Sequence, residues 1–320
     1  MILSGEKKEG VLPEEKPQMG SEGFQPEEKS QKKKKSVMKR VLGLLLLLLC
    51  LAAVLAGAVF LYWGYTKTHY EISFYQETSK KVSRNIRLAV ISDIHNREYG
   101  EGNETLISDI RALKPDLILF AGDMVIKSED NYEPMLKLVS AMADIAPCYG
   151  IMGNHEDERI YLKSDKKLPE KFEKAGMKVL RNRMETVQIG ADKIQLLGIS
   201  STTAYGFEEY GARKFMDGAD IDPNAYSIVM AHVPMLFDSQ ISAYRFDLGI
   251  AGHTHGGLVD IPGLGGLYSD EEGFFPKYYK GKQLLSNGAS LIISRGLGDS
   301  RQIPRINNMP ELLIIDINWY

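Results

Sequence analysis

Five short hydrophobic segments of this chain each run directly into an aspartate, an asparagine or a histidine. The segments occupy residues 86–91, 117–121, 148–152, 227–231 and 248–251, and the motifs after them contain Asp93 and His95, Asp123, Asn154 and His155, His232, and His253 and His255. Short apolar runs bounded by glycine and polar residues are typical of buried strands. Ligands bind at the carboxyl ends of the strands in open α/β sheets, so we expect these motifs to converge on one crevice.

The first of these segments alternate with helical patterns. Residues 104–113 and 132–143 carry apolar side chains at helical spacing, while later strand patterns cover residues 178–180, 185–189, 193–199, 291–294 and 311–317. Apolar residues three or four apart indicate helices, and short apolar runs indicate strands. The pattern predicts an α/β fold in which two packed sheets are flanked by helices.

Residues 41–63 form a run of 23 uncharged, mostly apolar positions. As a helix they would span about 34 Å, which is enough to cross the hydrocarbon core of a bilayer. Seven lysines and arginines between Lys29 and Arg40 precede the run, so we expect a cytoplasmic N-terminus and an extracytoplasmic folded domain at the cell membrane. A cleavable secretory signal is the alternative, because Ala56-Gly57-Ala58 resembles a cleavage site.

These features divide the chain into four parts. We expect a disordered, basic cytoplasmic tail at 1–40, a transmembrane anchor at 41–63, a stalk at 64–83 and the catalytic domain at 84–320. The tail holds ten of the 39 Lys and Arg residues, which leaves the remainder mildly acidic, and no basic face suggests nucleic-acid binding. Only Cys50 and Cys148 are present, so no disulfide framework is expected, and Cys148 is predicted to begin a buried strand.

The polar motifs combine side chains that suit divalent transition metals. Histidine supplies a neutral imidazole, aspartate a carboxylate that can bridge two cations, and asparagine an amide oxygen. This mixture favours manganese, iron, zinc or cobalt over calcium or magnesium, and it does not distinguish among the four.

In their order, the motifs resemble those of the calcineurin-like metallophosphoesterase superfamily: Asp-x-His, Gly-Asp, Gly-Asn-His-Glu, His and Gly-His-x-His. The loop Gly-Phe-Phe-Pro-Lys-Tyr at 273–278 is similar to that of its membrane-tethered or exported bacterial branch, although Leu258 and Asp260 stand where that branch commonly has Gln and Arg. The resemblance implies a four-layer α/β/β/α sandwich, here preceded by one transmembrane helix.

The resemblance also implies roles for individual residues. Asp93, His95 and His255 would hold one metal ion, Asn154, His232 and His253 a second, and Asp123 would bridge the two. A hydroxide bridging the metals would attack phosphorus. The catalytic residues would be Asp123, Asn154 and His155. Of these three, His155 would supply the proton for the leaving oxygen.

Several other residues admit two interpretations each. Glu156 either orients His155 or is a solvated acid, and Arg295 either contacts a substrate phosphate or forms an ordinary ion pair. The aromatic residues of the 273–279 loop either form an apolar wall for a lipid or base, or pack within the loop: Phe274, Phe275, Tyr278 and Tyr279.

The resulting prediction is a membrane-anchored, dinuclear metal-dependent hydrolase of a phosphodiester or pyrophosphate. Lipid-linked phosphoesters are among the substrates considered, and the oligomeric state is left open. The alternatives are a pyrophosphatase of a UDP-diacylglucosamine-type glycolipid, a phosphomonoesterase, and a non-enzymatic envelope module that binds phosphate lipids.

Overall fold

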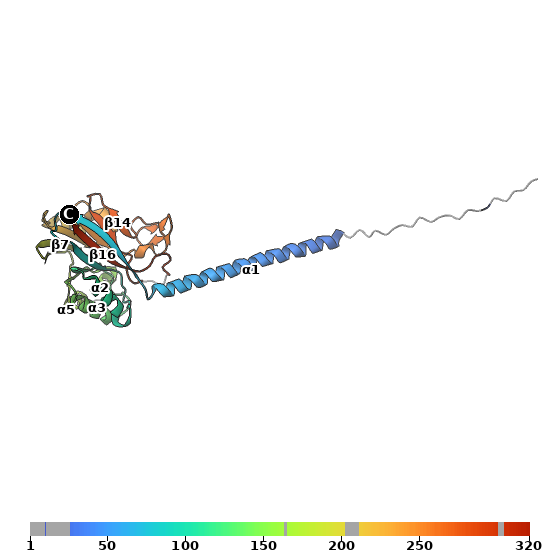
Figure 1. The fold of residues 1–320 in the computed structure, drawn as a ribbon, viewed down its shortest axis with the longest axis horizontal. Helices are drawn as coiled ribbons and strands as arrows, with labels where there is room; N and C mark the ends of the chain where they lie inside the picture. The colour runs from blue at the N-terminus through green and yellow to red at the C-terminus, as the bar shows by residue number, and fades with distance from the viewer. Residues whose placement is uncertain (1–9, 11–25, 163–164, 202–210, 300–303) are drawn as a thin grey trace, which may run out of the picture. The chain divides into compact units, whose positions relative to one another are not determined.

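Two six-stranded sheets form the centre of the folded unit (Figure 1). The computed structural model describes residue 10 and residues 26–162, 165–201, 211–299 and 304–320. The chain divides into two units, residues 1–56 and residues 57–320, and both sheets belong to the second.

The first sheet has the strand order β1 (Glu71–Ser79), β16 (Glu311–Trp319), β2 (Ile86–Ile91), β3 (Leu117–Phe120), β4 (Cys148–Gly150) and β5 (Met177–Val179). Strands β2 to β5 are parallel neighbours, whereas β16 runs antiparallel to β2. The second sheet has the order β14 (Gly281–Leu284), β15 (Ser290–Ile293), β9 (Leu248–Ala251), β8 (Tyr226–Ala231), β7 (Asp192–Ile199) and β6 (Arg183–Ile189). Its four central strands, β15, β9, β8 and β7, are parallel.

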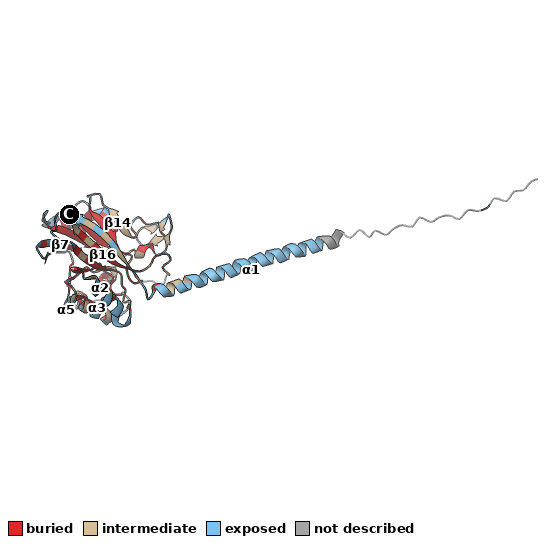
Figure 2. Ribbon diagram, viewed as in Figure 1, coloured by how far each residue is buried: buried red, intermediate tan, exposed pale blue. Residues whose placement is uncertain are grey.

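Alternating side chains build three apolar layers. In β2, Leu88 and Val90 pack between the sheets, while Ala89 and Ile91 face the outer helices, as the two-residue period of a strand requires. The buried strands stand out in red in Figure 2. Helices cover both outer faces, which confirms the predicted four-layer α/β/β/α sandwich. On the first sheet they are α2 (Glu104–Leu113), α3 (Glu133–Ala143) and α5 (Leu168–Lys174), and on the second α6 (Gly211–Gly218) and a π-helix (Phe237–Ile241).

The predicted stalk at 64–83 is corrected by the structure. Residues Glu71–Ser79 form strand β1, which pairs in parallel with β16 at the edge of the first sheet. The strand is only half buried: Ile72 packs toward the helices and Tyr75 toward the sheet interface, with polar residues between them. That mixed composition resembles a polar linker in the sequence, because an edge strand with one wet face has few apolar positions.

Helix α1 (Pro26–Thr66) begins before the predicted anchor at 41–63 and ends after it. Within the described part of the chain it is the one helix long and apolar enough to cross a membrane, and its apolar residues are exposed, as the pale blue ribbon in Figure 2 shows. It is a candidate membrane span or signal sequence. The disordered tail predicted at 1–40 lies mainly outside the described residues, and from Pro26 onward the chain is helical.

Candidate metal centre

All seven predicted ligands lie just beyond the carboxyl ends of five parallel strands. Asp93 and His95 follow β2, Asp123 follows β3, and Asn154 begins helix α4 (Asn154–Leu162) after β4. The second sheet contributes His232 after β8 and His253 and His255 after β9. Backbone hydrogen bonds join neighbouring turns, for example from the N–H of Asp93 to the carbonyl of Gly122 at 2.9 Å. Both sheets therefore present the turns that carry the candidate ligands at one edge.

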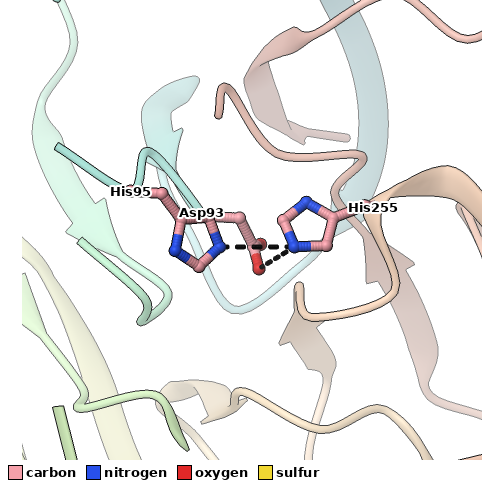
Figure 3. Close-up of side chains that lie close together, drawn as sticks. All are labelled: Asp93, His95 and His255. Atoms are coloured by element: carbon pink, nitrogen blue, oxygen red, sulfur yellow. Dashed lines mark hydrogen bonds and ion pairs between the residues drawn. The ribbon is translucent and has the colours of Figure 1, made fainter. Parts of the chain in front are cut away.

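The first cluster contains Asp93, His95 and His255 (Figure 3). The Nε2 atoms of the two imidazoles lie 3.3 Å apart. Nε2 of His255 is 3.8 Å from Oδ1 of Asp93. Three potential metal ligands thus face one point, and they come from turns that are far apart in the sequence.

The second cluster contains Asp123, His232 and His253, with Asn154 beside them. Nε2 of His232 lies 3.2 Å from Oδ2 of Asp123, and Nδ1 of His253 lies 2.9 Å from Oδ1 of Asn154. Asp123 also faces the first cluster, because its Oδ2 is 3.8 Å from Nε2 of His95. A carboxylate in this position can serve two cations.

His232 supplies the test of whether the residues fit a metal ion. Its Nδ1 lies 2.7 Å from the carbonyl oxygen of Ala121, which fixes the neutral ring with its proton on Nδ1 and a lone pair on Nε2. Within the described residues, the buried Nε2 faces only the carboxylates of Asp123 and Asp93, at 3.2 and 3.8 Å. Although burial opposes charge there, Asp123 and Asp93 raise the pKa of His232 to about 10. The two carboxylates thus favour a positive charge at Nε2, and a divalent cation could supply this charge in place of the second ring proton.

Most of the candidate ligands have an unusual backbone conformation. Positive φ values between 48° and 73° occur at Asp93, His95, Asp123, His253 and His255. Residues other than glycine rarely adopt this left-handed region, and each such residue costs about 1–3 kcal/mol. The sharp turns direct the side chains into the cleft, so part of the folding free energy is spent on the geometry of the site.

Glu156 has neither of the roles that the sequence suggested. It is fully buried and accepts backbone hydrogen bonds from Asp123, Val125 and Gly153 at 2.8–2.9 Å. Burial and the charge of Asp123 raise its pKa to about 8 despite these bonds. Its carboxyl group therefore fastens the turn after β3 to the turn after β4, which holds Asp123 in place.

His155 lies at the same edge, with its ring centre 4.7 Å from that of His95. Its Nδ1 accepts a hydrogen bond from the backbone N–H of Lys127 at 3.1 Å. The neutral ring must then carry its proton on Nε2. The remaining side of the ring can donate a hydrogen bond to a bound molecule.

Arg295, predicted as a substrate contact, is instead engaged in ion pairs. Its guanidinium group is paired with Glu71 and with Glu311, the latter at 3.0 Å, and it does not line the cavity at the metal cluster. The ion-pair alternative therefore describes this residue, because two carboxylates from the first sheet draw the guanidinium away from the cleft.

Three other residues lie near the candidate ligands but belong to no sequence motif: Glu271, Asp299 and Arg305. Glu271 accepts a hydrogen bond from Nε2 of His253 at 2.5 Å, an arrangement that orients Nδ1 toward Asn154. Arg305 is fully buried, pairs with Asp299 at 2.8 Å and lies 3.3 Å from Nδ1 of His255. Only their contacts with histidines distinguish Glu271 and Arg305 from ordinary loop charges, and these contacts require the folded chain.

A cavity of about 400 Å³ opens over the clusters. It is lined by Asp123, Lys127, Asn154, His155, Glu158, His253, Thr254, His255, Leu258, Tyr268, Ser269, Asp270, Glu271 and Asp299. Its apolar wall comes from Leu258 and Tyr268, whereas none of the four aromatic residues for which this role was one of two interpretations lines it. Tyr278 is buried in its loop, and Phe274 and Phe275 are exposed.

Comparisons with known proteins agree with this chemistry. The family model described as calcineurin-like phosphoesterase matches residues 86–257. The uncharacterized metallophosphoesterase YkuE of Bacillus subtilis is 25% identical over 83% of this chain and 93% of its own length. The phosphodiesterase YaeI of Escherichia coli is 26% identical over 72% of this chain and 82% of its own.

Solved structures show a weaker similarity. The NAD nucleotidase of Haemophilus influenzae aligns with a TM-score of 0.44 and 16% identity, covering 68% of this chain and 46% of that protein. The phosphopantetheinyl hydrolase of Mycobacterium tuberculosis aligns with a TM-score of 0.43 and 13% identity, covering 66% of this chain and 89% of its own. These scores are too low to support a functional argument.

Gly153 provides a test of the packing around Asp123. A Cβ atom at this position would lie 2.1 Å from Oδ1 of Asp123, so the Gly153→Ala variant must displace the carboxylate. We expect its affinity for Mn²⁺ to fall roughly 10- to 100-fold in calorimetry, as for other changes that misplace metal ligands. The matched control is Gly218→Ala, which has open space around the added methyl group. Equal affinities in the two variants would contradict this account of the site.

Proposed function

Since this chain belongs to the calcineurin-like phosphoesterase family and is a metal-dependent phosphoester hydrolase, we propose that it cleaves a phosphodiester or pyrophosphate at the cluster around Asp123. The family resemblance predicted from the five motifs is confirmed by the match to residues 86–257. The observation that carries the proposal is the convergence of four imidazoles, two carboxylates and one amide oxygen beneath a single cavity.

We propose two neighbouring sites for divalent metal ions. Asp93, His95 and His255 would hold one ion, and Asn154, His232 and His253 the other, with Asp123 shared. Such ions would neutralise phosphate charge and lower the pKa of bound water. Manganese, iron, zinc and cobalt all suit this set of donors.

The protein's own residues prepare this site in three ways. The hydrogen bond from His232 to the carbonyl of Ala121 keeps a lone pair on Nε2. Glu271 fixes the ring of His253, and Glu156 fixes the backbone of Asp123. These bonds hold the donors in one arrangement before substrate binds, which reduces the reorganisation needed during the reaction.

His155 is proposed to stabilise the leaving oxygen. The backbone N–H of Lys127 occupies its Nδ1, so the N–H at Nε2 is available to a substrate in the cavity that His155 lines. Donation from this N–H would offset the negative charge that develops on the departing oxygen.

A diester is favoured over a monoester by the charges around the cavity. Among the described residues, Asp270, Glu271 and Glu158 line it together with one lysine, Lys127, and with Asp299, whose charge is balanced by Arg97 and Arg305. A diester carries one negative charge fewer than a monoester dianion, so it meets less repulsion from these carboxylates. The named activity of YaeI, which covers 72% of this chain, is consistent with this preference.

The hydrolase proposal is tested with bis-p-nitrophenyl phosphate and p-nitrophenyl phosphate. We expect the full chain with Mn²⁺ to hydrolyse the diester, to lose this activity in EDTA, and to regain it when Mn²⁺ is restored. The His232→Gln variant should lower kcat/KM roughly 100-fold or more and reduce the bound metal, because it removes a donor from the cluster. Turnover of the monoester alone would reject the diesterase assignment. The absence of any turnover with metal bound would reject the proposed hydrolase activity.

His155→Gln tests the leaving-group role separately from metal binding. We expect kcat for the diester to fall roughly 10²- to 10⁴-fold while the metal content stays at that of the unmodified protein. His69→Gln is the matched control, because His69 is exposed and stacks on Tyr65 rather than facing the cavity. Loss of metal from His155→Gln would assign this histidine to ligation instead.

We also propose that α1 anchors the enzyme in the cell membrane, with the catalytic domain outside the cytoplasm. The basic residues before the apolar run, such as Lys35 and Arg40, support this orientation. The exposed apolar surface of α1 supports a membrane span, since no part of that window is buried in the protein.

Protease treatment of intact cells tests this topology. We expect added protease to degrade the C-terminal domain, detected with an antibody against residues 304–320, while a cytoplasmic control protein survives. Protection of the domain would reverse the orientation. Recovery of the domain in the soluble fraction, shortened at its N-terminus, would identify residues 41–63 as a cleaved signal.

A further inference from the structure

Two small hairpins beside the cavity expose large apolar side chains. The first joins β10 (Asp260–Ile261) to β11 (Gly265–Gly266), and Leu264 in its loop is 66% exposed. The second joins β12 (Tyr268–Ser269) to β13 (Gly273–Phe274), where Phe274 is 71% exposed and the following Phe275 is 54% exposed. Phe274 and Phe275 are neighbours in the chain, and Leu264 lies in the hairpin just before theirs; large exposed apolar side chains gathered in one short segment are unusual on a surface that meets only water.

The hairpins belong structurally to the metal centre. The N–H of Leu267, between them, donates to the carbonyls of Gly257 and Val259, directly after the ligand His255. Tyr268 lines the cavity, and the centre of its ring lies 5.5 Å from that of Phe274. Glu271, in the second turn, bonds to His253. Only the side chain of Tyr268 thus separates Phe274 from the cavity.

The end of α1 is also connected to the cavity. Arg97 donates from Nη1 to the carbonyl oxygen of Thr66, the last residue of α1, at 3.2 Å. Its Nη2 donates to Asp299 at 2.7 Å, and Asp299 lines the cavity. A single Arg–Asp pair therefore separates the end of the apolar helix from the space where substrate would bind.

The residues at the end of α1 have the character of a membrane boundary. Lys67 places its Nζ 4.0 Å from the centre of the Trp63 ring. Tryptophan and lysine are typical of the level at which a spanning helix leaves the hydrocarbon. If Trp63 marks that level, the cavity wall at Asp299 lies close to the lipid headgroups.

We propose that Leu264, Phe274 and Phe275 insert into the surface of the bilayer that α1 crosses, and that the cavity takes a phosphodiester or pyrophosphate carried on a lipid of that surface. This inference rests on the proposed hydrolase function and on α1 as a membrane span. A lipid bilayer explains both observations. The exposed hairpins adjoin the cavity through Tyr268, and the end of α1 adjoins the same cavity through Arg97 and Asp299.

Insertion is measured without reference to activity. The full chain carrying Cys50→Ser and Leu264→Cys is labelled with an environment-sensitive fluorophore and reconstituted in vesicles of phosphatidylethanolamine and phosphatidylglycerol. Cys148 is buried and does not compete for the label. We expect blue-shifted emission from position 264 that nitroxide-labelled lipids quench.

Leu284→Cys is the matched control for insertion. Leu284 is 79% exposed and pairs with Ser290, at the end of β15 away from the metal centre. A fluorophore there should behave as in water. Equal emission and quenching at the two positions would overturn the insertion proposal, whatever the enzyme hydrolyses.

Substrate class is measured with two diesters that share the p-nitrophenyl leaving group. One is bis-p-nitrophenyl phosphate in water, and the other is a diacylglycerol p-nitrophenyl phosphodiester within the same vesicles. We expect the Leu264→Ser, Phe274→Ser, Phe275→Ser triple variant to lose roughly tenfold or more of its turnover of the lipid substrate and to retain turnover of the soluble one. Leu284→Ser should retain both.

The outcomes separate the inference from the function on which it rests. An equal loss of both activities, or no loss of either, would overturn the lipid-surface proposal while leaving the hydrolase intact. No hydrolysis of either substrate by the unmodified protein with metal bound would reject the proposed function, and the fluorophore result would then still decide whether the hairpins enter the bilayer.

Discussion

The buried carboxylate of Asp123 is the group on which the arrangement of the site depends. One oxygen accepts the backbone N–H of His155 at 2.9 Å, and the other lies between His232 and His95 at 3.2 and 3.8 Å. Burial alone would raise the pKa of this carboxyl group, but the surrounding histidines hold it well below its usual range. A charged carboxylate without contact with water requires such partners, so the turns of both sheets are organised around it.

The sandwich makes this convergence possible. Each sheet is parallel at its centre, and both point the carboxyl ends of their strands toward the same edge of the molecule. The apolar layer between the sheets, with residues such as Val90 and Met230, keeps those edges in register. The turns beyond the strands can then adopt left-handed conformations, since the buried strands supply the stability that these conformations cost.

Charge explains a second group of contacts that surround the ligands. Glu156 and Glu271 are acids, yet each holds a candidate ligand, Asp123 and His253 respectively, through a hydrogen bond. Arg305 and Arg97 meet at Asp299, which joins the surroundings of His255 to the end of α1. The site is therefore continuous with the end of the apolar helix through ordinary ion pairs.

Much of this could be predicted from the sequence, because the relevant signals are local. Apolar runs ending in Asp, Asn or His identified the strands and the side chains at their ends, and the uncharged run at 41–63 identified the apolar helix. Strand β1 was missed because its alternating polar face looks like a linker. The sequence left Arg295 between a substrate contact and an ion pair, because its partners Glu71 and Glu311 are distant in the chain.

The sequence by itself thus determined the strands that lead into the candidate ligands, the chemistry of the donors and the family of the enzyme, since each depends on neighbouring residues and their spacing. Only the tertiary structure decided which acid supports which ligand, which arginine faces away from the cleft, and that the exposed hairpins lie beside the cavity. Those facts depend on contacts between residues such as His253 and Glu271, or Thr66 and Arg97, which the packing of two sheets brings together.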